Sequence, residues 1–220
     1  GYTTPEGEEE KKQRYLKIME KWIDKHPKDY MERSHVALTY HSMGKLVEAE
    51  NVYKIILEQT DCFADRNWIV YTSALLFLGR TYIKMGRLDD ALKYLKKAEE
   101  VDPEYMLTQV SLAEVYGKLS KLHEVIEHGL NALSQKTQHT FFPIDRNELI
   151  FSTHLLCGQA YRDLEKWKES IVEFRAAAEV PIARRCEALG HLFSLFQKLK
   201  RTTEAKGVIE EALAISPNHP

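Results

Sequence analysis

The sequence predicts an all-α protein made of stacked helical hairpins, and three observations carry this prediction. An aromatic residue recurs at steps of 42, 34, 45 and 35 residues, and small or apolar residues recur at fixed distances from it. Every strongly periodic segment has the three- and four-residue spacing of an amphipathic helix, without the alternation of a strand. Short turns such as Met85-Gly86-Arg87 fold each helix back on a partner. Because neither helix of a pair can bury its stripe alone, we expect the pairs to stack into one solenoid over residues 1–220.

The N-terminal residues 1–29 predict a lead-in and a capping helix. The helix is expected over residues 8–26, closed by Pro27, with one apolar side made by Tyr15, Leu16, Met19, Trp22 and Ile23. Pro27 stands 34 residues before Asp61, so this helix is in register as the tail of a hairpin. The acidic residues at its start are favourable there, because the N-terminus is the positive end of the helix dipole.

Five repeats follow, over residues 30–63, 72–105, 106–139, 151–184 and 186–219. Their aromatics are Tyr40, Tyr82, Tyr116, Tyr161 and Phe196. Small residues stand three positions earlier at Ala37, Gly79, Ala113 and Gly158, with Phe193 as the exception. Three further positions, each at a fixed distance after the aromatic, recur in all five copies, and we call each set a column. The columns are Ala49, Ala91, Val125, Ser170 and Ala205; Tyr53, Leu95, Gly129, Phe174 and Ile209; and Ile56, Ala98, Ala132, Ala177 and Ala212. The hairpins end near Asp61, Pro103, Thr137, Pro181 and Pro217, and the third copy is degenerate at Gly129 and Thr137.

Two insertions, residues 64–71 and 140–150, each precede a strong first helix, so we expect a longer loop and an extended helix start. Asp145 stands near an N-cap with Glu148 three residues later, the spacing of a capping box. The adjacent Phe141 and Phe142 either dock under the neighbouring hairpin or form an exposed ligand contact.

The composition favours a soluble protein of the cytoplasm. The formal charge of -2 gives no global field that would attract nucleic acid or an anionic membrane. No apolar run approaches the ~20 residues of a membrane span, and the N-terminus is too polar for a signal peptide. The three cysteines, Cys62, Cys157 and Cys186, form no CxxC pair and are expected to be free thiols in a reducing compartment.

No residue pattern predicts catalysis, a metal or a cofactor. His123 and His128 are five residues apart, so they do not share a helix face as zinc ligands would, and both are expected on the polar surface. Cys157 follows His154 by three residues but lies in an apolar column, which favours a core role. The sequence has no phosphate-binding glycine loop, and the short basic clusters at 96–97, 184–185 and 198–201 are expected to be solvated helix surface.

The segment from Leu75 to Tyr82, followed by Met85-Gly86, Ala91, Ala98 and Pro103, resembles the tetratricopeptide repeat family. The resemblance extends over nearly the whole chain and implies a right-handed superhelical solenoid. It also implies a concave groove, lined by the first helices, that binds an extended peptide or a helix of a protein partner. The implied groove residues are Ser34, Leu38, His41, Leu76, Arg80, Ile83, Val110, Glu114, Leu155, Gln159, Arg162, Ser194 and Gln197. The lysine and asparagine clamp of chaperone-binding relatives is absent from the matching positions, so binding of chaperone C-termini is not expected.

A narrower resemblance concerns the first thirty residues. Gly1-Tyr2-Thr3-Thr4-Pro5 and the basic helix behind it look like the junction of bacterial family-2 glycosyltransferases, where the nucleotide-sugar domain meets C-terminal tetratricopeptide repeats. This resemblance implies a non-catalytic arm that recognises an acceptor or forms an assembly, including a homo-oligomer. The alternatives are a stand-alone adaptor or a fragment of a peptide-sensing regulator.

Overall fold

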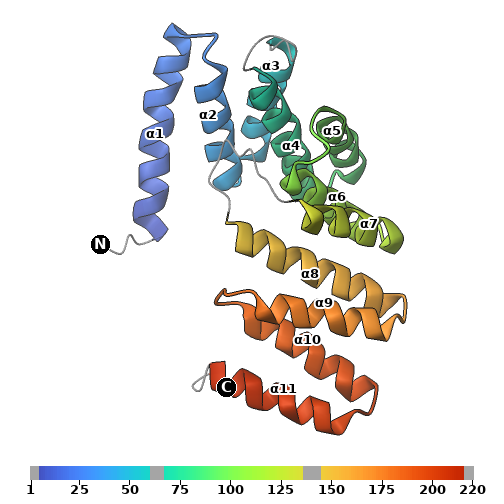
Figure 1. The fold of residues 1–220 in the computed structure, drawn as a ribbon. Helices are drawn as coiled ribbons and strands as arrows, with labels where there is room; N and C mark the ends of the chain where they lie inside the picture. The colour runs from blue at the N-terminus through green and yellow to red at the C-terminus, as the bar shows by residue number, and fades with distance from the viewer. Residues whose placement is uncertain (1–4, 60–66, 136–144, 216–220) are drawn as a thin grey trace. The chain divides into compact units, whose positions relative to one another are not determined.

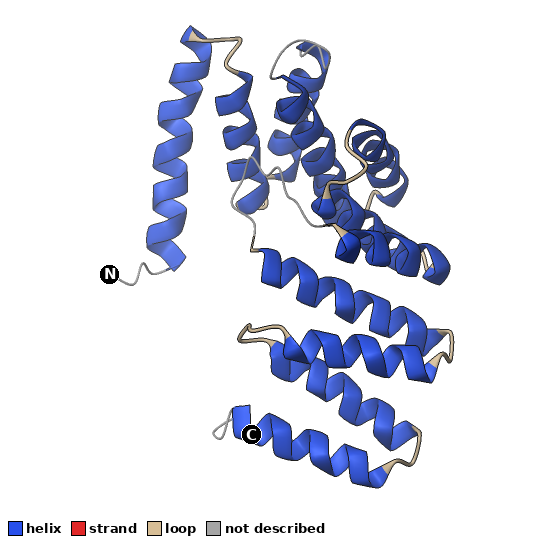
Figure 2. Ribbon diagram, viewed as in Figure 1, coloured by secondary structure: helices blue, strands red, loops and turns tan. Residues whose placement is uncertain are grey.

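The computed structural model describes residues 5–59, 67–135 and 145–215, which form eleven helices and contain no strand (Figure 1, Figure 2). The all-α prediction is confirmed. The helices gather into two compact units, residues 1–103 (unit 1) and residues 104–220 (unit 2). Asp61, Cys62, Thr137, Phe141, Phe142 and Pro217, for which the sequence made predictions, lie outside the described residues.

Unit 1 contains five helices. They are α1 (Pro5–Lys25), α2 (Tyr30–Ser42), α3 (Leu46–Gln59), α4 (Asn67–Met85) and α5 (Leu88–Val101). The pairs α2 with α3 and α4 with α5 are hairpins; α3 also packs on α4, and α1 covers α2 (Figure 1). Leu16 and Ile23 of α1 are buried against Val36, and Tyr15 and Met19 pack beside them, as the sequence predicted. The prediction was wrong for Trp22, which is 43 % exposed on another side of the helix.

Unit 2 contains three further hairpins. Their helices are α6 (Met106–Lys118), α7 (Leu122–Ser134), α8 (Arg146–Asp163), α9 (Trp167–Glu179), α10 (Arg185–Lys198) and α11 (Thr202–Ile215). Both α4 and α8 begin about five residues ahead of the expected repeat starts, as the insertions predicted. Asp145 caps α8, since its Oδ1 accepts from the backbone N–H groups of Asn147 and Glu148 at 2.9 and 3.3 Å.

Each hairpin turns through the same backbone structure, placed four residues after its aromatic. The residue there has a positive φ of 74° at Gly44 and Gly86, 57° at Ser120 and Lys200, and 58° at Glu165. The next N–H then donates to the carbonyl of the aromatic, as in Lys45 to Tyr40 at 2.9 Å and Arg201 to Phe196 at 2.9 Å. This is a helix stop that glycine adopts without strain. Three of the five copies therefore hold a left-handed residue that carries a side chain.

A basic residue follows every one of these turns. It is Lys45, Arg87, Lys121, Lys166 or Arg201. In three copies the cation lies over the ring of the aromatic five residues earlier, at 4.4 Å for Arg87 on Tyr82, 5.0 Å for Arg201 on Phe196 and 5.9 Å for Lys121 on Tyr116. Each such contact contributes roughly 0.5–1 kcal/mol at an exposed site. In these copies the aromatic ring is therefore part of the core, and one side of the ring contacts the basic residue that follows the turn.

The predicted small and apolar columns form the core of the first four hairpins. Ala37, Ala49, Ala91, Ala98 and Ala113 are fully buried. In the fifth hairpin the columns reach the surface, because α11 has a described neighbour on one side only; Ile209 is 43 % exposed.

Glycines mark the closest helix contacts. A Cβ at Gly79 would stand 2.6 Å from Cγ of Leu95, and one at Gly158 would stand 2.6 Å from Cε1 of Phe174. A Cβ at Gly129 would overlap the sulfur of Cys157. The third copy looks degenerate in sequence because α7 meets α8 at Gly129, where a larger residue could not fit. Its two helices are nevertheless a regular hairpin.

A buried carboxylate joins α3 to α4 in unit 1. Oε1 of Glu50 accepts from Lys54 at 2.7 Å and from the hydroxyl of Tyr82 at 2.8 Å, and Arg87 lies 3.3 Å from both of its oxygens. Burial alone would raise the pKa of Glu50, but the hydrogen bonds from Lys54 and Tyr82 outweigh it, and the pKa lies below its ordinary value. The group therefore stays ionised and connects two hairpins.

Candidate functional site

The predicted groove residues divide into buried and accessible groups. Six are buried, with exposures of 8 % or less: Ser34, His41, Leu76, Ile83, Val110 and Leu155. Seven reach the surface: Ser194 and Gln197 are exposed, and Leu38, Arg80, Glu114, Gln159 and Arg162 are partly buried. The buried residues hold first helices together, so the surface available to a ligand is a narrower strip of the predicted lining.

In unit 1 the buried members of the set make contacts between helices. Nδ1 of His41 lies 2.9 Å from Oγ1 of Thr81, which fastens α2 to α4. Burial, together with the nearby charges of Lys84 and Arg80, lowers the pKa of His41 to about 4. His41 is therefore a neutral hydrogen-bonding group within the stack.

Leu38 is the accessible apolar residue of the unit 1 surface. It lines a hollow of about 390 Å³ between α1 and α2, together with Lys11, Lys12, Tyr15, His35 and Thr39. The hydroxyl of Tyr15 donates to Oε2 of Glu32 at 3.3 Å, and burial together with Glu32 raises the pKa of Tyr15 to about 12. The hollow combines an apolar wall with two lysines.

In unit 2 the fold brings Glu114 and Gln159 together at the rim of one hollow. The hollow measures about 240 Å³ and lies where α6 and α7 meet α8. Its polar rim also includes Lys118 and Asp163, and its apolar floor is formed by Leu122, Val125, Leu156 and Ala160. A volume of this size accommodates one large side chain.

The strip continues from α8 to α10. Nε2 of Gln159 lies 3.4 Å from Nε2 of His191, and Nε of Arg162 donates to Oδ1 of Asp163 at 3.0 Å. Burial lowers the pKa of His191, and the charge of Arg162 lowers it further. The ring of His191 stacks on Phe174 at 5.0 Å, and Ser194 stands one helical turn farther along α10. We name the set Glu114, Gln159, Arg162, His191, Ser194 and Gln197 the unit 2 surface.

Sequence reasoning missed His191 in this surface. The available signal was its position three residues before Ser194 on the same helix, a spacing that places both on one face. The attraction of its ring to Phe174 of α9, which turns the imidazole toward Gln159, depends on a contact between separate helices and has no signature in one sequence.

The residues weighed for catalysis occupy structural positions. Cys157 is fully buried, as predicted, and burial raises the pKa of its thiol to about 12. His154, three residues earlier, turns away to Glu173, with Nδ1 at 2.7 Å from Oε2. No group of three His, Cys, Asp or Glu side chains in the described parts of the chain could hold a metal ion. Likewise, none of the described helices has the length and hydropathy needed to cross a membrane.

His128 corrects one prediction, because it is not a plain surface residue. Its ring stacks on Tyr116 at 5.2 Å, and its Nδ1 lies 2.8 Å from Oε1 of Gln109. His123 is exposed, as expected. The two histidines therefore lie on different faces of α7 and also differ in burial and in contacts.

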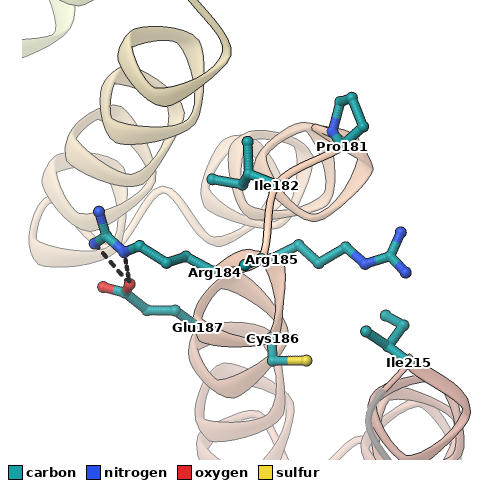
Figure 3. A pocket seen from close by; sticks show the side chains of 8 residues that line it. Pro181, Ile182, Arg184, Arg185, Cys186, Glu187 and Ile215 are labelled. Carbon is teal, nitrogen blue, oxygen red and sulfur yellow. Dashed lines mark hydrogen bonds and ion pairs between the residues drawn. The ribbon is translucent and has the colours of Figure 1, made fainter. Parts of the chain in front are cut away.

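A second hollow of unit 2, about 580 Å³ in volume, opens at the turn between α9 and α10 (Figure 3). Arg184 points away from it, donating to Oε2 of Glu187 at 2.8 Å and to Oε1 of Glu148 at 2.6 Å. Arg185 extends in the opposite direction, to the side on which Cys186 and Ile215 also lie (Figure 3). The two arginines of the basic pair therefore point to different sides, and the exposed Arg184 forms ion pairs with Glu148 and Glu187.

Comparisons with known proteins agree with the fold of stacked helical hairpins. Residues 30–104 match the family model described as a tetratricopeptide repeat. No curated protein matches the sequence. The crystal structure of MamA protein superimposes with a TM-score of 0.67 at 18% identity, covering 86% of this chain and 92% of that one.

Two further structures extend the comparison. YrrB, described as a TPR protein with an unusual peptide-binding site, gives a TM-score of 0.65 at 18% identity over 91% of this chain and 93% of its own. A chain of the APC/C hetero-tetramer Cut9-Hcn1 gives 0.54 at 22% identity over 94% of this chain and 44% of its own. At these identities the likeness shows that the chain has the tetratricopeptide-type fold.

Proposed function

We propose that this chain is a protein-binding scaffold and that its unit 2 surface holds an extended peptide segment of a partner. The observation that carries the proposal is the row of accessible polar groups from the first helices of three successive hairpins, beside an apolar hollow of about 240 Å³. An extended peptide needs hydrogen-bonding groups for its backbone and a pocket for alternate side chains. YrrB, a structural neighbour described as having a peptide-binding site, supports this choice.

The charges around the hollow favour one kind of peptide. Asp163 is already paired with Arg162, whereas Glu114 makes no ion pair within the described residues. A lysine or arginine of the ligand would therefore gain most from Glu114. We infer a preferred segment with a large apolar residue for the hollow and a basic residue beside it.

The test is selection from a phage-displayed library of random peptides of about twelve residues, followed by calorimetry with the selected peptide. We expect selected peptides to pair an apolar residue with a basic one, and Glu114→Lys to weaken binding at least about tenfold. The matched control is Glu127→Lys, an exposed charge reversal on α7 that should leave binding unchanged. Selection of no peptide, or equal losses in both variants, would refute the proposal.

We also propose, on the resemblance of residues 1–30 alone, that the chain is the non-catalytic C-terminal region of a family-2 glycosyltransferase. The scaffold would then present an acceptor to a nucleotide-sugar domain, and charge reversal at Arg80 or Arg162 should weaken acceptor use and spare donor hydrolysis. The full-length reading frame of the gene tests the glycosyltransferase proposal. A reading frame that encodes an upstream domain with an Asp-x-Asp motif agrees with it. A frame with more repeats, a DNA-binding domain or no further domain leaves the stand-alone adaptor or peptide-sensing regulator.

A further inference from the structure

The outer side of α1 carries an apolar and basic stripe that the peptide surface does not use. The stripe runs over about three turns, or roughly 16 Å. It lines a hollow of about 340 Å³ and consists of Arg14, Lys17, Ile18, Lys21, Trp22 and Lys25. We name these six residues the α1 stripe. It lies opposite Leu16 and Ile23, which are buried on α2.

The register of the repeats shows that α1 occupies the place of a second helix. Trp22 stands 34 residues before Ile56, and Met19 stands 34 before Tyr53. Each later second helix, α3, α5, α7, α9 or α11, packs on the first helix of its own hairpin. Ile56 is accordingly fully buried on α3, whereas Trp22 is 43 % exposed and Ile18 is 57 % exposed. The apolar part of the stripe therefore faces outward from a position where this fold packs a helix.

Trp22 is held in one orientation. Its ring stacks on His26 with centroids 3.9 Å apart, and its Nε1 donates to Oδ2 of Asp29 at 3.0 Å. Asp29 is fixed in turn, because its Oδ1 accepts from the N–H of Glu32 at the start of α2. A preformed aromatic anchor lowers the conformational entropy that an incoming partner must remove.

The charge of the stripe defines the partner. Its four cations make no ion pair within the described residues, and they flank Ile18 and Trp22 on both sides. The acids nearest to them on α1 are Glu10, Glu20 and Asp24, and the carboxylate of Glu20 accepts from the hydroxyl of Tyr40. A like-charged copy of the same stripe would be repelled. An acidic helix would gain attraction along its whole length.

We propose that the α1 stripe docks an acidic amphipathic helix of a partner protein, whose apolar residues cover Ile18 and Trp22 and whose carboxylates meet the four cations. A membrane surface fits less well, because only two apolar side chains point outward and Asp24 stands beside them. The site is separate from the unit 2 surface and does not depend on it.

The probe is a labelled, end-capped peptide of about 18 residues, roughly five turns, with leucine at helical spacing and glutamate on both flanks. Fluorescence anisotropy should show binding, and the double variant Lys17→Glu with Lys21→Glu should weaken it at least about tenfold and flatten its salt dependence. Ile18→Ala should weaken it severalfold while leaving the contacts of Trp22 in place. Val47→Ala, 62 % exposed on α3, and Lys96→Glu on α5 are the matched controls and should change nothing.

Several results would overturn the proposal. They are equal binding of a peptide with the same composition in scrambled order, equal binding of a peptide with lysine in place of glutamate, and equal losses in the control variants. Phosphatidylserine vesicles bound more tightly than the peptide would assign the stripe to a membrane. A dimer of the chain that Lys17→Glu with Lys21→Glu dissociates would assign it to a second copy.

Discussion

The two units connect their hairpins by different means. In unit 1, α3 meets α4 through the carboxylate of Glu50, which binds Lys54, Tyr82 and Arg87. In unit 2, α7 of one hairpin meets α8 of the next where Gly129 lies against the sulfur of Cys157. The repeat therefore determines how far apart neighbouring hairpins lie, whereas the contact between them can be made either by an ionic network or by close packing at a glycine.

The largest expected effect is at the glycine contacts of unit 2. Gly158→Leu should destabilise the protein by about 3 kcal/mol, because the fully buried ring of Phe174 cannot move aside. Gly79→Leu in unit 1 should cost less, about 1–2 kcal/mol, because the aliphatic side chain of Leu95, although buried, can change its rotamer more readily than the ring of Phe174. Urea titration measures both. The control is Gly190→Ala, where an added Cβ meets nothing within 4 Å. Equal stability of all three variants would show that the helix contacts are looser than described.

The carboxylate of unit 1 gives the next effect. Glu50→Ala should destabilise by about 2 kcal/mol, because it leaves the buried hydroxyl of Tyr82 without its acceptor. Glu50→Gln keeps an acceptor oxygen and should cost about 1 kcal/mol. The exposed Glu127→Ala serves as the control in the same urea titrations. If Glu50→Ala behaved like that control, the network would contribute nothing to unit 1.

Acid should weaken unit 1 through His41. Its folded pKa of about 4 lies below the ordinary value, so the unfolded chain takes up the proton first. Stability is therefore lost as the pH falls from about 6.5 to about 4, by on the order of 2 kcal/mol. His41→Gln, which can still hydrogen-bond to Thr81, should remove that part of the loss. Unfolding free energies measured across this pH range provide the test, and identical pH slopes in the two proteins would exclude His41 as the cause.

The smallest effect is a gain in stability at the hairpin turns. Glu165→Gly and Lys200→Gly should each stabilise the protein by roughly 0.5–1 kcal/mol. At both positions φ is positive, which strains a residue that carries a Cβ and does not strain glycine. Thermal melting detects such a shift. Gly86→Ala should have the opposite sign, since φ is 74° there. A gain from Gly86→Ala would contradict this account of the turns.

Most of the fold could be predicted because it depends on local periodicity. The columns at Ala49, Ala91 and Val125 follow from spacing alone, and they are buried. The accessible part of the predicted groove was harder to predict. The first helices contact one another, α2 with α4 and α6 with α8, so Leu76 and Val110 became packing residues. Pairs such as His41 with Thr81, forty residues apart, depend on stacking that one sequence does not reveal.

Mapping of backbone amide shifts by nuclear magnetic resonance tests directly whether peptides bind the unit 2 surface, as proposed. A selected peptide should shift the amides of Glu114, Gln159, Arg162 and Ser194, and it should leave those of Val172 and Leu213 on the second helices unchanged. Val172 and Leu213 are 64 % and 52 % exposed and apolar, so they would report non-specific apolar binding. Shifts confined to the second helices, or spread evenly over both sets, would contradict the claim.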